Sequence, residues 1–181
     1  MKRSSTVICT ALFALVATVS LTAQMGTPTP APAPELKKLA FMAGDWMSEG
    51  DMKPGPGMPG GKFTYSTHAE WMDGNFFLVE HSNADMPGMG KFTELAVLGY
   101  DPDRKVYTYQ AFNSLGQNET STGTVDGDTW TFLSDEHFGG NTFKGRYAMK
   151  VLSPTSYTMK FEMSQDGTNW MTGMEGKATK K

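Results

Sequence analysis

Hydrogen-bonding side chains recur at alternate positions between residues 66 and 81. They are Ser66, His68 and Glu70, followed by His81 on the next apolar segment. Because alternate residues of a β-strand share one face, these groups can lie together if the two segments form a hairpin. Two imidazoles, a carboxylate and a hydroxyl would orient a ligand if that face lines an interior, since binding pockets combine apolar walls with a few polar groups.

The turn between the two segments sets the register of this hairpin. A two-residue turn at Asp73 and Gly74 pairs Met72 with Asn75. This register places Glu70 opposite Phe77, His68 opposite Val79, and Ser66 opposite His81. An alternative is that the polar face is exposed to solvent. The other face, which burial of apolar side chains would then direct inward, carries Trp71, Phe76 and Leu78.

The residue types needed for catalysis do not assemble in this chain. The single cysteine, Cys9, lies in the apolar amino-terminal run, and the chain has three histidines. No nucleophile, base and orienting group occur at a recognisable spacing, and no glycine-rich phosphate loop follows a strand and opens a helix. We therefore expect a binding protein without a cofactor rather than an enzyme.

The elements that must position these residues are predominantly β-strands. Short runs rich in Phe, Tyr, Trp, Thr and Val recur at the spacing of meanders and barrels, separated by turn residues. We expect about ten strands, at residues 45–52, 62–72, 75–82, 91–100, 105–113, 118–125, 129–135, 142–152, 156–164 and 169–177. One short helix is expected before them, at residues 35–42.

Tight turns join these strands, for example at Asp126-Gly127 and Asp166-Gly167. Short connections of this kind link neighbouring antiparallel strands. An open meander of so many strands would leave long unpaired edges, and closure into a barrel removes them. We therefore predict an all-β fold, a single antiparallel up-and-down β-barrel, whose width leaves room for one small ligand.

The carboxyl-terminal half has distinct apolar and polar faces. From residue 157 to residue 163 every second side chain is aromatic or methionine, and the side chains between them are polar. Period-two alternation predicts that the apolar set faces the interior. Its members are Tyr157, Met159, Phe161 and Met163, joined by Tyr147 and Met149 on the preceding strand. These side chains either fill the core or form the apolar wall of a cavity.

The amino-terminal segment is expected to direct export. Lys2 and Arg3 precede an apolar run that ends in small residues, which is the pattern of a secretory signal peptide over residues 1–23. Alternating prolines predict an extended linker over 24–34, and the barrel domain is expected at 35–181. After cleavage no membrane span remains. The net charge of −3 becomes more negative, which disfavours nucleic acid as a partner. We expect a periplasmic or secreted protein.

Four short motifs follow one another in the order seen in a known family. They are Gly44-Asp45-Trp46, Asp73-Gly74-Asn75-Phe76, Gly99-Tyr100-Asp101 with Tyr107, and Asp166-Gly167 with Trp170. In this order the chain resembles the domain of unknown function 1579 family over nearly all of residues 35–177. The short helix before Trp46 also resembles the opening of lipocalin-type barrels. The resemblance implies a calycin-like barrel whose floor is sealed by Trp46, and no established activity.

Two features depart from what the resemblance implies. Lipocalins place a late arginine across the opening tryptophan, but strand alternation directs Arg146, the only late arginine, outward with Lys144 and Lys150. Nitrobindin-like relatives bind haem through a histidine near the carboxyl end. The last histidine here is His137, so haem binding is not expected.

The expected function is binding of a small apolar or amphipathic ligand in the interior of the barrel. The residues expected to contact it are Trp46, Ser66, His68, Glu70, Phe77, His81, Tyr147 and Phe161. One alternative is a Cu(I)-binding protein, because thioether sulfur selects Cu(I) and Met86 and Met89 follow His81 closely. A simpler explanation is that these methionines fill gaps. The other alternative is an interaction module that acts through the outer surface of a filled barrel.

Overall fold

The computed structural model describes residues 30–55, 59–138 and 140–181. The expected signal peptide and residues 24–29 of the expected linker lie outside the described residues. The described elements are the 3₁₀ helix η1 (Pro34–Met42) and the strands β1 (Gly44–Met52), β2 (Gly61–Trp71), β3 (Leu78–Met86), β4 (Gly90–Asp101), β5 (Val106–Asn113), β6 (Asn118–Asp126), β7 (Thr129–Phe138), β8 (Asn141–Ser153), β9 (Ser156–Ser164) and β10 (Met171–Lys180). In this part of the chain no helix has the length and apolar character needed to cross a membrane.

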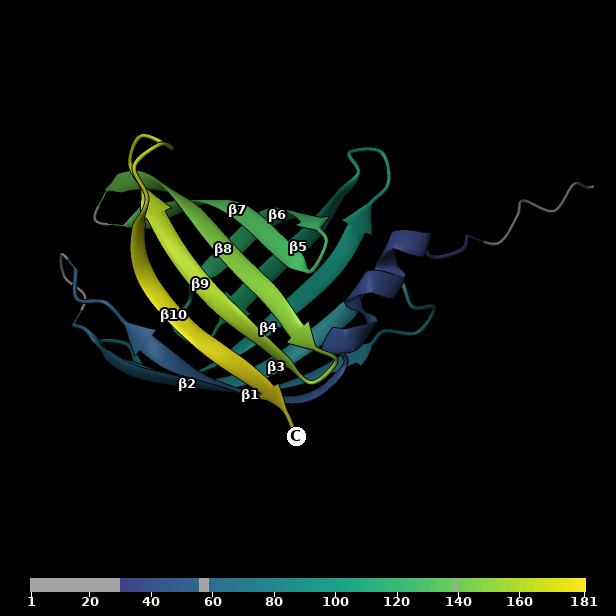
Figure 1. Ribbon diagram of the computed structural model, residues 1–181, viewed down its shortest axis with the longest axis horizontal. Helices are drawn as coiled ribbons and strands as arrows, with labels where there is room; N and C mark the ends of the chain where they lie inside the picture. Colours follow the sequence, from purple (N-terminus) through teal and green to yellow (C-terminus); the bar gives the residue numbers. More distant parts are fainter. Residues whose placement is uncertain (1–29, 56–58, 139) are drawn as a thin grey trace, which may run out of the picture. The chain divides into compact units, whose positions relative to one another are not determined.

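The ten strands form one closed antiparallel barrel (Figure 1). Each strand pairs with its neighbours in the sequence, and β1 pairs with β10 to close the sheet. Along this seam the Cα partners run from Trp46 opposite Lys180 to Met52 opposite Met174. Closure gives each of the ten described strands a neighbour on both sides. The predicted fold class, an all-β up-and-down barrel of ten strands with one short helix, is confirmed.

The connection between β2 and β3 is longer than the expected two-residue turn. The Asn75 amide donates to the Met72 carbonyl (2.9 Å), and the Met72 amide donates to the Phe77 carbonyl (2.9 Å). Gly74 and Asn75 have φ values of 88° and 58°, which these two residue types tolerate. The predicted register is therefore wrong by two residues. The structure places Glu70 opposite Val79, His68 opposite His81, and Ser66 opposite Asn83. Because side chains alternate with a period of two, a register shift of two residues does not change which of the paired residues share a face of the hairpin.

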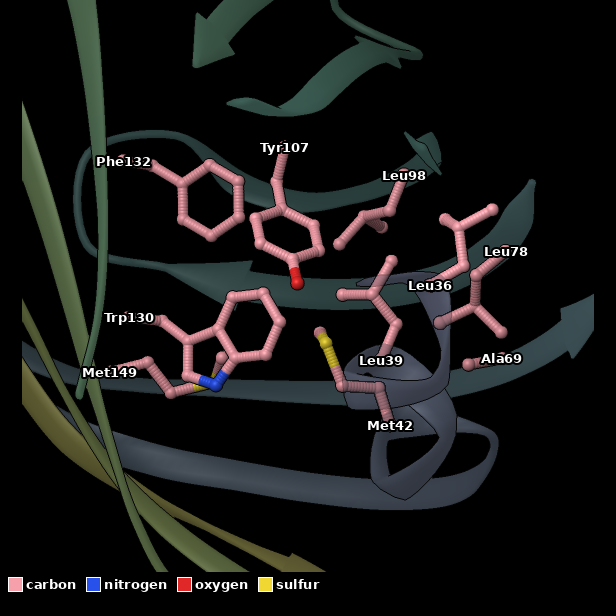
Figure 2. Close-up of a cluster of buried hydrophobic side chains, with 10 residues drawn as sticks. All are labelled: Leu36, Leu39, Met42, Ala69, Leu78, Leu98, Tyr107, Trp130, Phe132 and Met149. Carbon is pink, nitrogen blue, oxygen red and sulfur yellow. The ribbon is translucent and has the colours of Figure 1, made fainter. Parts of the chain in front are cut away.

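Helix η1 closes one end of the barrel (Figure 1). Figure 2 shows Leu36, Leu39 and Met42 directed from the helix toward side chains of the strands. Their buried partners are Ala69, Leu78, Leu98, Tyr107, Trp130, Phe132 and Met149. The Tyr107 hydroxyl donates to the carbonyl of Glu35 (3.0 Å), which fixes the helix against β5. This end of the barrel is a packed floor.

Trp46 lies in this floor. Its side chain is 3% exposed, and its indole N–H donates to the Met42 carbonyl (2.7 Å). A lysine packs across the ring: Lys180 Nζ lies 5.4 Å from the ring centroid and donates to the Phe41 carbonyl (3.1 Å). The cation beside Trp46 therefore comes from the last strand, β10, and not from an arginine.

Arg146 points outward, as strand alternation predicted. Its guanidinium carbon lies 4.1 Å from the centroid of the Trp170 ring, and one terminal nitrogen lies 2.7 Å from a carboxylate oxygen of Glu162. This stack covers Glu162, which is only 8% exposed. The outer face of β8 and β9 thus holds the arginine away from the floor.

Candidate ligand site in the barrel interior

The polar face of the β2–β3 hairpin lies on the outer wall of the barrel. The side chains of His68 and Glu70 are 54% and 66% exposed, and Ser66 and His81 share their face. Leu78, on the opposite face, is 0% exposed. The expected inward orientation of the polar face is therefore wrong. Burial of the apolar side chains of the other face decides the orientation.

An exposed ion pair holds His68 on this outer wall. Its Nδ1 lies 2.7 Å from a carboxylate oxygen of Asp45. The hydrogen bond to Asp45 is the main reason that the pKa of His68 is raised from 6.5, and the charges of Asp45 and Glu70 add to it. Since water surrounds both partners, the pair contributes little to stability.

We expect Asp45→Asn to lower the pKa of His68 toward its ordinary value. Because the pKa is raised in the folded state, the interaction stabilises the fold below the ordinary pKa of histidine. This contribution is lost as pH rises through the folded pKa. The measurement is an NMR titration of the His68 ring protons, with Glu49→Gln on the outer face of β1 as the control. A pKa that stays raised in Asp45→Asn would show that this contact does not form.

Two other expected groupings also fail to form. Phe77 lies outside the barrel and is 44% exposed. His81 and Met86 occupy opposite faces of β3, because their positions in the strand differ by an odd number of residues. Met86 faces inward and its sulfur accepts a hydrogen bond from the Tyr65 hydroxyl (3.3 Å), whereas Met89 lies in the turn that follows. His81 and Met86 therefore cannot converge on one Cu(I) ion.

Trp46, Tyr147 and Phe161 do face the interior. Tyr147 and Phe161 are cross-strand partners on β8 and β9, and each keeps part of its surface accessible. Tyr147 packs against both buried clusters of the barrel. Trp46 is part of the packed floor, so Tyr147 and Phe161 are the predicted residues that form an accessible wall.

Four glutamates on four strands also point into the barrel, and none of them was expected. They are Glu80 on β3, Glu94 on β4, Glu119 on β6 and Glu136 on β7. Glu80, for example, lies between the buried Leu78 and Ser82 on the inner face of its strand. Glu136 accepts a hydrogen bond from the Ser134 hydroxyl (2.6 Å). Within the described residues, none of the four forms an ion pair.

Burial raises the pKa values of three of these carboxyls. It is the main cause for Glu80, whose pKa rises from 4.5 to about 7 with a further contribution from the charge of Glu94. Burial likewise raises the pKa of Glu119 to about 7, and the charges of Glu136 and Glu94 add to it. The pKa of Glu94 is raised by burial and partly lowered by a hydrogen bond from Tyr109. Glu80 and Glu119 therefore titrate near neutral pH.

Electrostatic effects across the barrel show that these side chains share one space. Burial is the main cause of the raised pKa of Tyr147 on β8, and the charge of Glu80 on β3 adds to it. β8 and β3 lie on opposite sides of the closed strand order. The pKa of Tyr109 on β5 is also raised by burial, with contributions from the charges of Glu94 and Glu80. The inward carboxylates therefore influence the pKa values of tyrosines on other strands of the barrel.

Positive charge is nearly absent from the inner face. Along the described strands, the lysines and arginines take outward positions, with the exception of Lys180. Lys180 is held in the floor, where its ammonium donates to the Phe41 carbonyl. The histidines of β2, β3 and β7 also lie on the outer wall. The lumen above the floor therefore carries carboxyls without a basic partner from the described part of the chain.

The inner face of the barrel above the floor is not fully buried. Several inward-facing side chains remain partly exposed, namely Tyr65, Thr67, Glu80, Glu94, Tyr109, Tyr147, Phe161, Met163 and Met174. A side chain on the inner face of a closed barrel can be accessible only where neighbouring side chains leave space. The inner face above the floor therefore carries aromatic, methionine and carboxyl groups that their neighbours cover only in part.

Shallow grooves also occur on the outer wall. The larger, of about 720 Å³, is formed by β1, β2, β9 and β10 and includes the ion pair between Lys62 and Asp51 (2.8 Å). The other, of about 350 Å³, lies beside His81 and includes Leu95 and Phe112, which are 39% and 55% exposed. Both grooves are open to solvent on the outer wall, whereas the inward aromatic and carboxyl side chains are surrounded by the closed sheet.

Comparison with known proteins agrees with this architecture. The family model described as "Protein of unknown function (DUF1579)" matches residues 31–180. The chain belongs to this family. It is similar to the crystal structure of Rv2717c from M. tuberculosis, with a TM-score of 0.56 and 15% sequence identity over 83% of this chain and 99% of that chain. At this identity the likeness shows a shared fold alone. No protein with a curated description matches the chain.

The sequence of this DUF1579 protein does contain a signal for the inward glutamates. Along β4 the alternate residues are Phe92, Glu94, Ala96 and Leu98, so apolar neighbours two positions away direct Glu94 inward. Leu78 directs Glu80 inward in the same way. Glutamate side chains are usually exposed to solvent, so the sequence alone favours an outward orientation for these residues. The burial of their neighbours on the same face of the strand shows that they point inward.

Proposed function

We propose that this protein is an exported carrier or sensor that binds one small, partly apolar molecule inside its barrel. Export is supported by the apolar amino-terminal run and the proline-rich segment after it. One observation carries the binding proposal: inward aromatic side chains, among them Tyr65, Tyr147 and Phe161, stay partly accessible inside a closed barrel. A protein that needed only a stable core would fill this space, because interiors are close-packed.

The composition of the walls supports the same proposal. Tyr147 and Phe161 offer apolar surface, and Glu80 and Glu94 offer a few polar groups on the facing strands. This combination is typical of small-molecule pockets. Helix η1 covers one end of the barrel, and the turn between β9 and β10 lies at the other (Figure 1). A ligand would enter through the end that η1 does not cover.

A neutral environment-sensitive dye tests this proposal. We expect N-phenyl-1-naphthylamine to bind the purified exported protein saturably, with a dissociation constant in the range of about 1–10 µM that is usual for modest apolar contacts. Ala111 is 3% exposed and lies opposite Glu119 on the inner face. We expect Ala111→Trp to weaken dye binding about tenfold by occupying the space of the ligand.

Gln110→Trp is the matched control, because Gln110 is the exposed neighbour on the outer face of the same strand. It should leave dye fluorescence unchanged. Thermal melts of both variants establish that each is folded before the dye is added. Dye fluorescence that rises without saturation, or that changes equally in the two variants, would contradict binding inside the barrel.

A further inference from the structure

We propose that the molecule bound inside this barrel carries a positive charge, an organic ammonium group on an apolar body, and that Glu80, Glu94 and Glu119 pair with it. This inference rests on the proposed function, because it concerns the same interior site. It adds the charge of the ligand, which no feature of the family or of the fold specifies.

The first argument is the imbalance of charge within the lumen. Carboxyl groups from β3, β4, β6 and β7 face it, and in the described part of the chain none of them forms an ion pair. The one inward lysine, Lys180, is bound to the Phe41 carbonyl in the floor. A carboxylate removed from water is unfavourable unless it is paired. A cationic ligand would supply the missing partner for several of them at once.

The second argument is an unpartnered hydroxyl inside the same space. Ser121 is 4% exposed, and its hydroxyl has no hydrogen-bond partner within the described residues. It lies on the inner face of β6, two residues after Glu119, and its interaction with that carboxyl lowers the pKa of Glu119. Buried hydroxyls are nearly always paired. A donor on a bound ligand would satisfy both Ser121 and Glu119.

The aromatic walls favour an organic cation over a metal ion. No group of three or more acidic, histidine or cysteine side chains within the described residues is close enough to hold a metal. Tyr109 and Tyr147 instead place aromatic rings in the same lumen as Glu80. The faces of such rings attract ammonium groups, and their apolar surface would contact the body of the ligand.

The charge of the site changes within the neutral pH range. The ionisable groups that interact electrostatically with Glu80 are Glu94 on the neighbouring strand β4, Tyr109 on β5, and Tyr147 and Tyr157 on β8 and β9 across the barrel. Burial raises the pKa of every one of them, so the tyrosines stay neutral, whereas Glu80 titrates near pH 7. A bound cation would favour the ionised glutamates, and its affinity should therefore fall as they become protonated at lower pH.

Three compounds that share a dodecyl chain and differ in the charge of their head group test whether the site prefers a cation. Dodecylamine, dodecanol and dodecanoate, each below its aggregation concentration, compete with bound N-phenyl-1-naphthylamine. We expect dodecylamine to displace the dye at a concentration about tenfold lower than dodecanol, which corresponds to one charge-assisted hydrogen bond. Dodecanoate should displace it least. The advantage of the amine over the alcohol should shrink when the pH is lowered from about 8 to about 5.5.

Conservative variants assign the effect to the inward carboxyls. Glu80→Gln and Glu119→Gln, made separately, should reduce the preference for the amine about fivefold to tenfold and leave dodecanol unaffected. Glu70→Gln is the control, since Glu70 lies on the outer wall. Equal displacement by the three ligands, or an amine preference that survives both inward variants, would overturn this inference and leave the proposed function standing. Failure of the dye itself to bind would instead count against the proposed function.

Discussion

Replacement of Glu80 by glutamine should increase the free energy of unfolding by about 2–3 kcal/mol near pH 8. The reason is that the folded protein raises the pKa of Glu80 from 4.5 to about 7, so the ionised carboxylate is disfavoured by folding. A raised carboxyl pKa lowers stability as pH increases from the unfolded value to the folded value, and the penalty is complete above both. Glutamine has nearly the same shape and carries no charge to desolvate.

Urea unfolding of the wild type and the variant at about pH 5 and about pH 8 measures this effect. Most of the difference should disappear at the lower pH, where the folded carboxyl is protonated. Glu70→Gln on the outer wall, 66% exposed at its side chain, should change stability little at either pH. A Glu80→Gln protein that is less stable than the wild type near pH 8 would mean that the carboxylate has a favourable partner. Together with the dye competition, a variant that gains stability and loses the preference for the amine would identify a residue kept for binding.

Trp46→Ala should lower the free energy of unfolding by about 4 kcal/mol, the usual cost of removing a large aromatic side chain from a core. Trp46 is 3% exposed and contacts three elements of the floor. Its ring lies 6.4 Å from Phe41 in the helix and 5.1 Å from Tyr157 on β9, and Lys180 Nζ on β10 packs across it. The substitution would also leave the Met42 carbonyl without its donor.

Trp170→Ala is the matched control, because Trp170 stacks on Arg146 on the outer wall. Its loss should cost about 1 kcal/mol, as for a partly exposed cation–π contact. Trp46→Phe separates the ring from the hydrogen bond and should cost about 1–2 kcal/mol. Thermal and urea unfolding measure all three variants. Comparable losses in Trp46→Ala and Trp170→Ala would show that η1 and the floor contribute little to the stability of the barrel.

The parts of the candidate site that could be predicted from the sequence lie where one face of a strand is clearly apolar. Tyr147 and Phe161 alternate with polar residues, so period two alone placed them inside. The hairpin of β2 and β3 carries large side chains on one face and hydrogen-bonding groups on the other, and its orientation could not be read with the same certainty. The predicted site directs His68 and Glu70 inward, and the structure places them on the outer wall.

Features that depend on residues close together in the sequence could be predicted without a structure. Apolar and aromatic periodicity, together with glycine and aspartate at the turns, determined the ten strands, the short helix before them and the antiparallel order of neighbours, because these depend on residues close in the sequence. The predicted register of the turn at Asn75 is wrong by two residues. A shift of two residues does not exchange the two faces of a strand, so the predicted alternation along β3 is confirmed.

Only the tertiary structure decided which face of each strand is concave and what meets there. Glu80, Glu94 and Glu119 lie on β3, β4 and β6, and the curvature of the sheet that closes β1 onto β10 directs all three toward one lumen. The same closure places Lys180 rather than Arg146 beside Trp46. A pKa near 7 for Glu80 likewise exists only in the folded barrel, because desolvation and the charge of Glu94 both act through space and not along the chain.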